Sequence, residues 1–393
     1  MTKLDKLIQE LCPDGVEFRK VKEAYQRLKG TPITAGKMKE IDNPQGEIKI
    51  FAGGRTVINA KEEDIPNANI TRVPAVLVQS RGVIDAIYYD KPFTFKNEMW
   101  AYTADEPVSV KFLYYVLKNN MDYFRSAAAG MGSLPQISLP VTENFVIPVP
   151  PLPVQREIVR ILDNFTELTA ELTAELTARK KQYEFYRDKL LDFAGNTDVK
   201  NVPLGDIAKF VYGYTDKAKE TGSVRFVRIT DISEDGRLNP YDAKYVELTD
   251  ESKKYLLKKG DLLLARTGAT YGKTLYFEED EPAVYASFLI KIILDNSVIK
   301  NRYYWHFSKS SLYWEQAERY VSKGGQQQFN TNAVSRVIVP IPSLEVQDRI
   351  IYVLDNFDAI CTDLSSGLPA EIEARQKQYE YYRDKLLSFE EKI

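Results

Sequence analysis

The chain has 393 residues, of which 44% are hydrophobic and 28% charged, a composition typical of folded domains. This length suits two domains of ordinary size better than one core. No apolar stretch reaches the roughly 20 residues that span a membrane, and the N-terminus lacks the apolar core of a secretion signal. The two cysteines, Cys12 and Cys361, argue against a disulfide framework or a cysteine-rich zinc site and favour a reducing cytoplasm.

The net charge of −3 does not by itself indicate a nucleic-acid-binding protein, because such proteins usually carry a basic face. Much of the acidity lies in residues 345–393, which hold 11 Asp and Glu against 6 Lys and Arg. Any affinity for nucleic acid must therefore come from positive charge gathered on one face, or from a partner.

In chain order, the first predicted element is a short helix over residues 2–11. Its apolar residues fall on one helical face, at Leu4, Leu7, Ile8 and Leu11. We expect this helix to pack beside the end of the last helix of the chain, which would close a ring-like arrangement.

Two regions, from about 14 to 147 and from about 198 to 339, are rich in aromatic residues and short strand-like runs. The predicted strands lie at 48–51, 75–78, 225–229, 261–264 and 288–293. Each region then has a predicted helix, over 110–127 and 300–320, followed by a glycine-rich loop and a final strand. At a shift of 192 residues, Gly132, Gln136 and Val146 align with Gly324, Gln328 and Ile338. The two regions are therefore predicted to be diverged copies of one mixed α/β domain.

A long helix is predicted after each of these domains. Residues 178–193 recur as 374–389, with 13 of 16 positions identical. Apolar residues in 153–193 recur at steps of three, four and seven, which indicates one stripe on a helix about 60 Å long, and Pro153 suits its first turn. The second copy carries its own stripe, so we expect the two helices to pack on each other.

The two helices differ in their middle parts. Residues 168–176 repeat the tetrad Leu-Thr-Ala-Glu, which keeps leucine on one helical face. The second copy instead contains Gly367-Leu368-Pro369, which is predicted to break or kink the helix.

Three parts of the repeat unit closely resemble the conserved regions of type I restriction-modification specificity subunits. They are Pro-x-Pro-x-Leu-x-Val-Gln, Leu-Asp-Asn-Phe and Lys-Gln-Tyr-Glu-x-Tyr-Arg-Asp-Lys-Leu-Leu. The resemblance implies an α+β chain of two mixed α/β target-recognition domains, at 1–150 and 196–342. It also implies two conserved spacer helices, at 151–195 and 343–393, that form an antiparallel coiled coil with pseudo-two-fold symmetry.

The resemblance also implies a function and a set of partners. Each domain would read half of a split site in double-stranded DNA, while the helices fix the spacer and dock two methyltransferase subunits, through which restriction subunits join. The subunit itself would hold no catalytic residue, metal or cofactor. The sequence agrees: it has no Asp/Asn-Pro-Pro-Phe/Tyr motif for amino-group methylation. Residues 268–274 only approximate a phosphate loop and predict a strand–turn–strand, and the single histidine, His306, lies among aromatic residues that favour packing.

Base reading calls for Arg, Gln or Asn on exposed loops, and five segments offer them. These are the turns at 53–56 and 79–82, the turn at 266–273, and the loops 130–136 and 323–328. The candidate DNA-binding residues are Arg55, Gln79, Ser80, Arg81, Ser133, Gln136, Arg266, Thr267, Thr270, Tyr271, Lys273, Lys323, Gln326, Gln327 and Gln328.

Two other interpretations remain open from the sequence. The near-neutral domains would suit a coiled-coil scaffold that binds two proteins and no DNA. Aromatic clefts would suit an enzyme with a small substrate, although the sequence shows no paired acid and base. Salt-sensitive binding of DNA would separate the first interpretation from a DNA reader.

Overall fold

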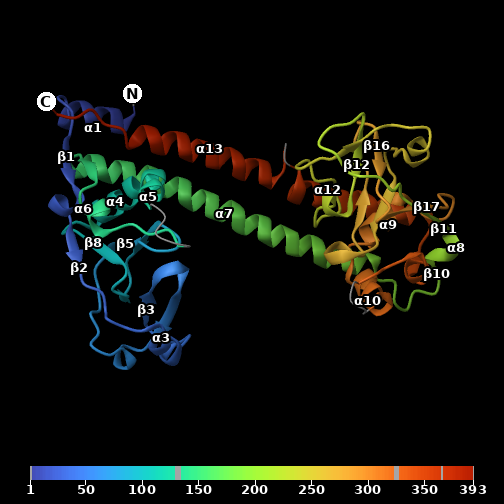
Figure 1. The fold of residues 1–393 in the computed structure, drawn as a ribbon, viewed down its shortest axis with the longest axis horizontal. Coiled ribbons are helices and arrows are strands. Elements are labelled where there is room, and N and C mark those ends of the chain that lie inside the picture. The colour runs from blue at the N-terminus through green and yellow to red at the C-terminus, as the bar shows by residue number, and fades with distance from the viewer. Residues whose placement is uncertain (1, 129–133, 323–326, 364–365, 393) are drawn as a thin grey trace. The chain divides into compact units, whose positions relative to one another are not determined.

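The computed structural model describes residues 2–128, 134–322, 327–363 and 366–392, and it divides into two compact units (Figure 1). Unit 1 takes residues 1–172 and 372–393, and unit 2 takes residues 173–371. Across the described ranges, no helix combines the length and the apolar character needed to cross a lipid bilayer. The long helix α7 (Leu152–Leu191) contributes its first half to unit 1 and its second half to unit 2.

Unit 1 holds two main sheets and one strand pair. An antiparallel sheet has the order β2-β8-β5-β6, a second has the order β4-β3-β7 with β3 and β7 parallel, and β1 pairs with β9. The strands are β1 (Glu17–Lys20), β2 (Gln26–Leu28), β3 (Ile48–Phe51), β4 (Val57–Ala60), β5 (Ala75–Gln79), β6 (Asp85–Tyr89), β7 (Phe93–Phe95), β8 (Trp100–Thr103) and β9 (Val146–Val149). The helices before α7 are α1 (Lys3–Leu11), α2 (Val21–Ala24), α3 (Ala35–Ile41), α4 (Pro107–Asn119), α5 (Met121–Ala127) and α6 (Leu139–Glu143).

Unit 2 repeats this topology strand for strand. Its sheets have the orders β11-β17-β14-β15 and β13-β12-β16, the latter with β12 and β16 parallel, and β10 pairs with β18. The strands are β10 (Lys200–Pro203), β11 (Ala208–Tyr212), β12 (Val224–Val227), β13 (Tyr245–Val246), β14 (Leu262–Ala265), β15 (Thr274–Tyr276), β16 (Ala283–Tyr285), β17 (Leu289–Leu294) and β18 (Ile338–Ile341). The helices are α8 (Leu204–Ile207), α9 (Asn301–Phe307), α10 (Ser311–Tyr320), α11 (Thr331–Val334) and α12 (Leu344–Thr362). The prediction of two diverged copies of one mixed domain is confirmed.

The five predicted strands all form, but the two predicted domain helices were each too long. The helix expected over 110–127 is divided at Asn120, whose backbone leaves the helical region, into α4 and α5. The helix expected over 300–320 ends at Phe307, and the Ser310 side chain then accepts the backbone N–H of Tyr313 to begin α10. A capping side chain of this kind stabilises a new helix start, which the apolar periodicity alone does not register.

The two long helices follow the prediction closely. Helix α7 has 40 residues, with Pro153 in its first turn. The second copy is interrupted: α12 ends at Thr362, Asp363 is extended, and α13 (Leu368–Leu386) begins beside Gly367. The predicted break at Gly367-Leu368-Pro369 is therefore confirmed.

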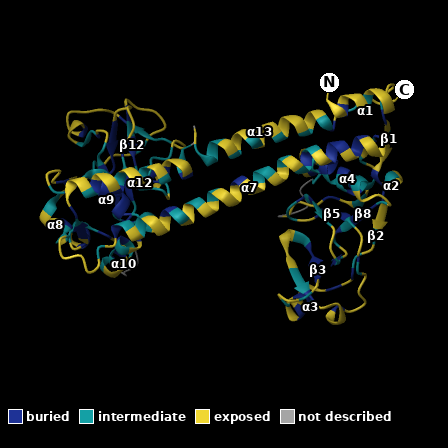
Figure 2. Ribbon diagram, turned by 180° about the vertical axis from the view of Figure 1, so that it is seen from behind, coloured by how far each residue is buried: buried dark blue, intermediate teal, exposed yellow. Residues whose placement is uncertain are grey.

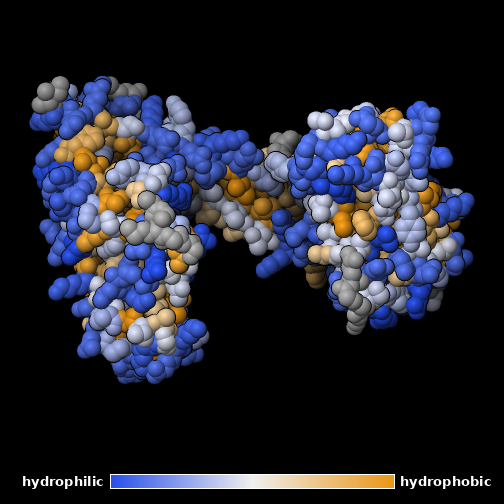
Figure 3. All heavy atoms as spheres, in the orientation of Figure 1, coloured by the Kyte–Doolittle hydropathy of each residue, from blue (hydrophilic) through white to orange (hydrophobic). Residues whose placement is uncertain are grey.

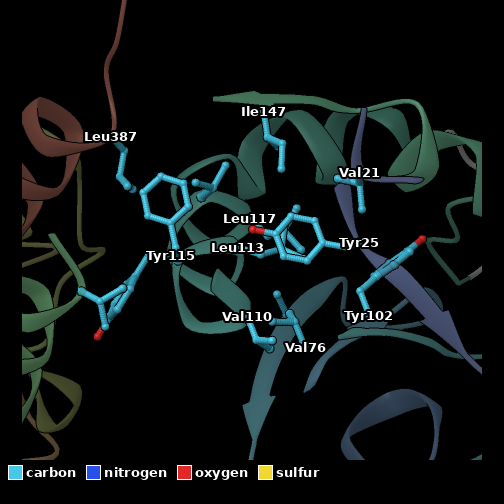
Figure 4. Close-up of a cluster of buried hydrophobic side chains, with 14 of the residues drawn as sticks. Val21, Tyr25, Val76, Tyr102, Val110, Leu113, Tyr115, Leu117, Ile147 and Leu387 are labelled. Atoms are coloured by element: carbon cyan, nitrogen blue, oxygen red, sulfur yellow. The ribbon is translucent and has the colours of Figure 1, made fainter. Parts of the chain in front are cut away.

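The core of unit 1 joins elements from both ends of the chain. Figure 4 shows Val110 of α4 beside Val76 of β5, and Leu113 and Leu117 of α4 beside Tyr25. Leu387, which follows α13, belongs to the same cluster. Buried residues of α7 continue this core, and they form the dark stripe along its first half in Figure 2. Leu4 of α1 belongs to the same cluster.

As predicted, the first helix lies in unit 1 with the chain end: Leu4 shares a core cluster with Leu387, and the segment just after the helix pairs with the last residues. The ring-like closure stays a prediction. The backbone N–H of Val16 donates to the carbonyl of Glu390 at 2.9 Å, and the N–H of Lys392 donates to the carbonyl of Val16 at 2.9 Å. The segment after α1 and the segment after α13 thus share one strip of parallel backbone pairing in unit 1.

Helix packing is the same in both units. In unit 1, Phe165 of α7 stacks on Tyr382 of α13, with ring centres 5.6 Å apart and planes 25° apart. In unit 2, Phe357 of α12 stacks on Tyr186 of α7, at 5.6 Å and 24°. The two phenylalanines are related by the shift of 192 and the two tyrosines by the shift of 196. In each unit the helices pack antiparallel, which confirms the expected fold class of two mixed domains on paired, pseudo-symmetric helices.

Candidate nucleic-acid interface

Three of the predicted polar segments of unit 1 meet at one edge of the domain. The N–H of Gly54 donates to the carbonyl of Arg81 at 3.3 Å, and the N–H of Gly82 donates to the carbonyl of Pro135 at 2.9 Å. Arg81 and Gln136 form an antiparallel bridge. The turn after β3, the turn after β5 and the loop before α6 are therefore held together by backbone hydrogen bonds, although more than 50 residues of sequence separate the second from the third.

The side chains at this edge combine positive charge with one half-buried acid. Arg55, Arg81 and Gln136 are exposed. Beneath them, Glu98 accepts the N–H of Gly53 at 3.0 Å and pairs with Lys96 at 2.8 Å. Burial on its own would raise the pKa of the Glu98 carboxyl, but these two partners and the charge of Arg81 hold it below its usual value. The carboxylate therefore stays ionised and fixes the turn while the guanidinium groups face solvent.

Three predicted contact residues are buried and cannot present their side chains to DNA. Gln79 and Ser80 lie at the end of β5, where the Ser80 hydroxyl donates to the carbonyl of Glu98. Thr267 is also buried, and its hydroxyl donates to the carbonyl of Gln327 at 3.2 Å. The Ser80 and Thr267 hydroxyls hold the turns in place because they satisfy backbone carbonyls beneath the surface.

The turn after β14 in unit 2 meets its loop in the same way. The N–H of Phe329 donates to the carbonyl of Arg266 at 2.7 Å, and Thr267 forms an antiparallel bridge with Gln328. The Arg266 guanidinium is half-buried: it lies over the ring of Tyr212 at 5.2 Å, and its Nε donates to the carbonyl of Ser287. Packing thus occupies part of the Arg266 side chain.

The remaining unit 2 candidates divide between turn and loop. Residues 268–276 form the predicted turn and strand, which confirms the strand–turn–strand interpretation. Tyr271 meets the edge of Trp314 at 6.1 Å, and Thr270 and Lys273 are half-buried beside it. Gln327 and Gln328 are exposed. Ser133, Lys323 and Gln326 lie outside the described residues.

Unit 2 has a third segment of this kind, a turn that was not among the predicted ones. Residues 229–231 follow β12 as residues 53–55 follow β3. Ile229 lies 3.7 Å from the position that a Cβ would take at Gly268, much as Gly54 lies 3.5 Å from that position at Gly82. Thr230 is exposed there. The sequence could have indicated this turn, because it follows the strand predicted at 225–229 as the turn of unit 1 follows the strand predicted at 48–51.

His306 is buried in a polar contact between helices. Its Nε2 lies 2.7 Å from Oδ1 of Asp355, and its Nδ1 lies 3.1 Å from the hydroxyl of Tyr183. Burial lowers the pKa of His306 to about 4, so the ring is neutral at pH 7. The expected packing role is confirmed. In the part of the chain that the structure describes, no group of three or more His, Cys, Asp or Glu side chains is arranged to hold a metal ion.

Comparison with known proteins identifies the class of this interface. Residues 13–179 and 196–374 each match the family model described as the type I restriction modification DNA specificity domain. The chain belongs to this family. It is 34% identical over 316 residues to a putative type I restriction enzyme specificity subunit of Haemophilus influenzae, which covers 76% of this chain and 77% of the relative. It is 33% identical over 297 residues to a type I restriction enzyme specificity subunit of Escherichia coli, which covers 72% of each chain.

Solved structures agree on the fold. The S subunit of a type I restriction-modification system from Mycoplasma genitalium superposes with a TM-score of 0.61 at 18% identity, over 95% of this chain and 96% of the other. As a specificity subunit, the protein is the DNA-recognition component of a type I system and is not its catalyst. The scaffold and enzyme interpretations are left without support.

Proposed function

We propose that each unit of this specificity subunit reads one half of a bipartite site in double-stranded DNA. The observation that supports this is the duplicated bridge between turn and loop, Arg81 with Gln136 in unit 1 and Thr267 with Gln328 in unit 2. Both bridges sit at the same place in the same topology, yet they carry different side chains. Two readers of one design but different chemistry suit a target with two dissimilar halves. We assign the reading to the domains at 1–150 and 196–342.

The exposed side chains of unit 1 have the geometry of base readers. Arg55 and Arg81 can each donate two hydrogen bonds to guanine O6 and N7, and Gln136 can pair with adenine N6 and N7. The buried Gln79 and Ser80 would act by shaping the turn. Ser133 remains a candidate next to Gln136.

Unit 2 offers a less basic set of readers. Gln327 and Gln328 are amide readers of the same kind, and Lys273 supplies a charge for guanine or phosphate. Tyr271 and Thr270 line the turn, and we add Thr230 from the third turn. Lys323 and Gln326 belong to the same loop as the two glutamines and remain candidates, as does Arg266 through the free edge of its guanidinium group.

The conserved helices provide two equivalent surfaces for methyltransferase subunits. Phe185 of α7 is 62% exposed, and its repeat counterpart Tyr381 of α13 is 63% exposed. Tyr186 and Tyr382 beside them are also partly exposed. Hydrophobic side chains are visible at the surface of the helical segment in Figure 3. Large apolar side chains left open at two repeat-related positions suit two copies of one partner. We propose that methyltransferase subunits dock there and that restriction subunits join through them.

Mapping of methylated adenines tests the proposed reading. The full chain is co-expressed with the methyltransferase encoded beside it, and modified positions are mapped in genomic DNA. We expect a split motif with a fixed gap. Arg81→Ala should relax base preference in one half only, and Gln328→Ala in the other half only, with a loss of about 1–3 kcal/mol in discrimination at the affected base. Arg19→Ala is the control, because Arg19 forms an exposed ion pair with Glu17 on β1, outside the three segments that meet at the interface. A contiguous motif would refute the proposal.

The proposed docking surfaces are tested by stoichiometry. Phe185→Ala and Tyr381→Ala each remove one exposed aromatic side chain, so each single variant should retain one methyltransferase and lose the other. Mass measurement of the purified complex reads this out directly. Two methyltransferases bound to the double variant, or none bound to either single variant, would contradict equivalent and independent surfaces.

A further inference from the structure

Each domain is tied to its long helix by an aspartate that receives two side chains from one domain helix. In unit 1 this is Asp163 of α7. Its Oδ2 accepts Lys111 Nζ at 2.8 Å, and its Oδ1 accepts the hydroxyl of Tyr115 at 2.5 Å. Both donors stand on α4. The Lys111 ammonium also lies 5.3 Å from the ring centre of Tyr88, on β6 of the sheet.

Unit 2 repeats this contact with different side chains. Asp355 of α12 accepts Arg302 Nε at 2.7 Å, and His306 Nε2 lies 2.7 Å from the same carboxylate oxygen. Both partners stand on α9. The Arg302 guanidinium lies 4.7 Å from the ring centre of Tyr276, on β15.

The two contacts are equivalent by sequence as well as by geometry. The aspartates are related by a shift of 192, within the repeated Leu-Asp-Asn-Phe block. Their partners are related by a shift of 191, so that Lys111 corresponds to Arg302. The cation and its neighbour have changed type between the copies, while the aspartate and the ring under the cation have stayed. We call this arrangement of aspartate, cation and sheet tyrosine the clasp.

The clasp fixes the orientation of the domain on its long helix more than it stabilises the fold. The aspartate side chains are 33% and 36% exposed, and ion pairs at such exposure are worth little to the free energy of unfolding. A carboxylate with two donors on one helix nevertheless resists rotation of that helix, because rotation breaks one of the two bonds. The tyrosine under the cation lies on β6 in unit 1 and on β15 in unit 2. Each of these strands follows a turn that we propose to read DNA, at 79–82 and 266–273, and we call it the reading turn. The contact therefore also restrains the strand next to the reading turn.

A small rotation at the clasp would move the reading turn by a whole base-pair step. Arg81 and Tyr88 are seven positions apart, and at about 3.3 Å per residue they span at most about 23 Å. A rotation of about 10° on such an arm displaces its end by at most about 4 Å, which is comparable to the rise of one base pair, about 3.4 Å. The angle of each domain on its helix therefore matters as much to spacing as helix length does.

We propose that Asp163 and Asp355 are positioning residues that set the tolerance of the subunit for spacer length, and this rests on the proposed reading of a bipartite site. Unit 2 has a second ionic contact between domain and helix, from Lys309 and Arg237 to Asp358 of α12. Its repeat counterpart in unit 1 is Thr166, which has no charge. Loss of the clasp should therefore matter more in unit 1.

The test measures affinity for three DNA duplexes that carry the mapped half-sites with the native spacer, one base pair more and one base pair fewer. The full chain is used in complex with the methyltransferase. If the wild type favours the native spacer about tenfold or more, Asp163→Asn should reduce this preference to about threefold or less, without altering base preference in either half-site. Asp355→Asn should have the smaller effect. Glu167→Gln, an exposed carboxylate four residues further along α7, is the matched control.

Two further variants separate positioning from folding. Lys111→Arg places in unit 1 the type of cation that unit 2 has at this position, so this variant should keep the wild-type preference for the native spacer. Lys111→Met removes the cation and should behave as Asp163→Asn does. Equal weakening on all three duplexes, or an unchanged preference in Asp163→Asn, would overturn the positioning role. Failure of the wild type to show any split site would instead overturn the proposed reading itself.

Discussion

At the scale of single residues, unit 2 contains a buried ionic cluster around Asp358. This side chain is 2% exposed, and it receives Lys309 Nζ at 3.1 Å and the guanidinium of Arg237. Lys309 lies 3.5 Å from the ring centre of Trp305. Burial lowers the pKa of Lys309 to about 8, so the ammonium remains charged at pH 7. The buried Asp358 thus pairs with a buried lysine and a half-buried arginine, and the arginine also contacts Asp235 and Glu278.

Removal of that aspartate should be costly. Asp358→Asn removes the carboxylate that pairs with the buried Lys309 ammonium, while Arg237 keeps Asp235 and Glu278, and we expect a loss of about 3–5 kcal/mol in the free energy of unfolding. Urea denaturation of the full chain measures it. Glu345→Gln is the control, because Glu345 pairs with Arg349 at 75% exposure on the same helix and should change stability by less than about 1 kcal/mol. Similar losses in both variants would contradict the cluster's role.

His306 should make unit 2 sensitive to acid. Its pKa is about 4 in the folded chain, against 6.5 without burial, so the unfolded chain takes up the proton first as pH falls. Stability from this group is complete above pH 6.5 and is lost progressively down to pH 4, by about 3 kcal/mol at most at 1.36 kcal/mol per pKa unit. The charged or titratable groups facing the ring are Asp355, Arg302, Lys309 and Tyr183.

The measurement compares wild type with His306→Gln in urea at pH 7.5 and pH 5. Glutamine can still donate to Asp355 but does not titrate. We expect the wild type to lose more free energy of unfolding than the variant between pH 7.5 and pH 5. The carboxyl groups of the chain contribute equally to both proteins, so the difference reports His306. Parallel losses would show that His306 does not titrate on unfolding.

At the scale of elements, α1 packs on the core of unit 1 that contains the end of the last helix. Leu4 is 6% exposed within the core that includes Leu387, whereas Leu11 on the same helix is 44% exposed. Burial of one face thus attaches a nine-residue helix that would be marginal alone.

Two substitutions on α1 separate packing from helix propensity. Leu4→Ala should lower the free energy of unfolding by about 2–5 kcal/mol, because it removes buried methyl groups and leaves a cavity. Leu11→Ala should change it by less than about 1 kcal/mol. Deletion of residues 1–11 should lower the melting temperature at least as far as Leu4→Ala does. An unchanged melting temperature after the deletion would mean that α1 contributes nothing to the fold.

At the scale of the whole molecule, we propose that the tetrads at 168–176 make the length of α7 set the separation of the two half-sites. Insertion of one further Thr-Ala-Glu-Leu after Leu176 lengthens the helix by about 6 Å, at about 1.5 Å per residue. Mapping of methylated adenines should then show a spacer widened by at least one base pair, with both half-sites unchanged. The same tetrad inserted after Gly195, outside the helix, is the control and should leave the spacer as it was. Altered half-sites, or an unchanged spacer after the first insertion, would refute the role of α7.

The sequence predicted the helices and strands better than it predicted which candidate DNA-binding residues are exposed. Arg55, Arg81 and Gln136 were identified as exposed polar residues beside glycines, and the structure brings them to one edge. Gln79 and Ser80 were identified by the same rule but are buried, because β5 is covered on both faces up to its end. The alternation of residues along a strand cannot show that its last residues are covered from both sides.

By itself, the sequence determined the elements whose signal is local or repeated: the duplicated helices, the break beside Gly367, the five strands and the shared domain plan. Periodicity and self-similarity specify these because each depends on neighbours a few residues away or on a second copy in the chain. The tertiary structure alone decided which side chains meet. Lys111 reaches Asp163 across 52 residues and Arg302 reaches Asp355 across 53. Such contacts depend on how sheets and helices pack, a long-range property that no local pattern in the chain encodes.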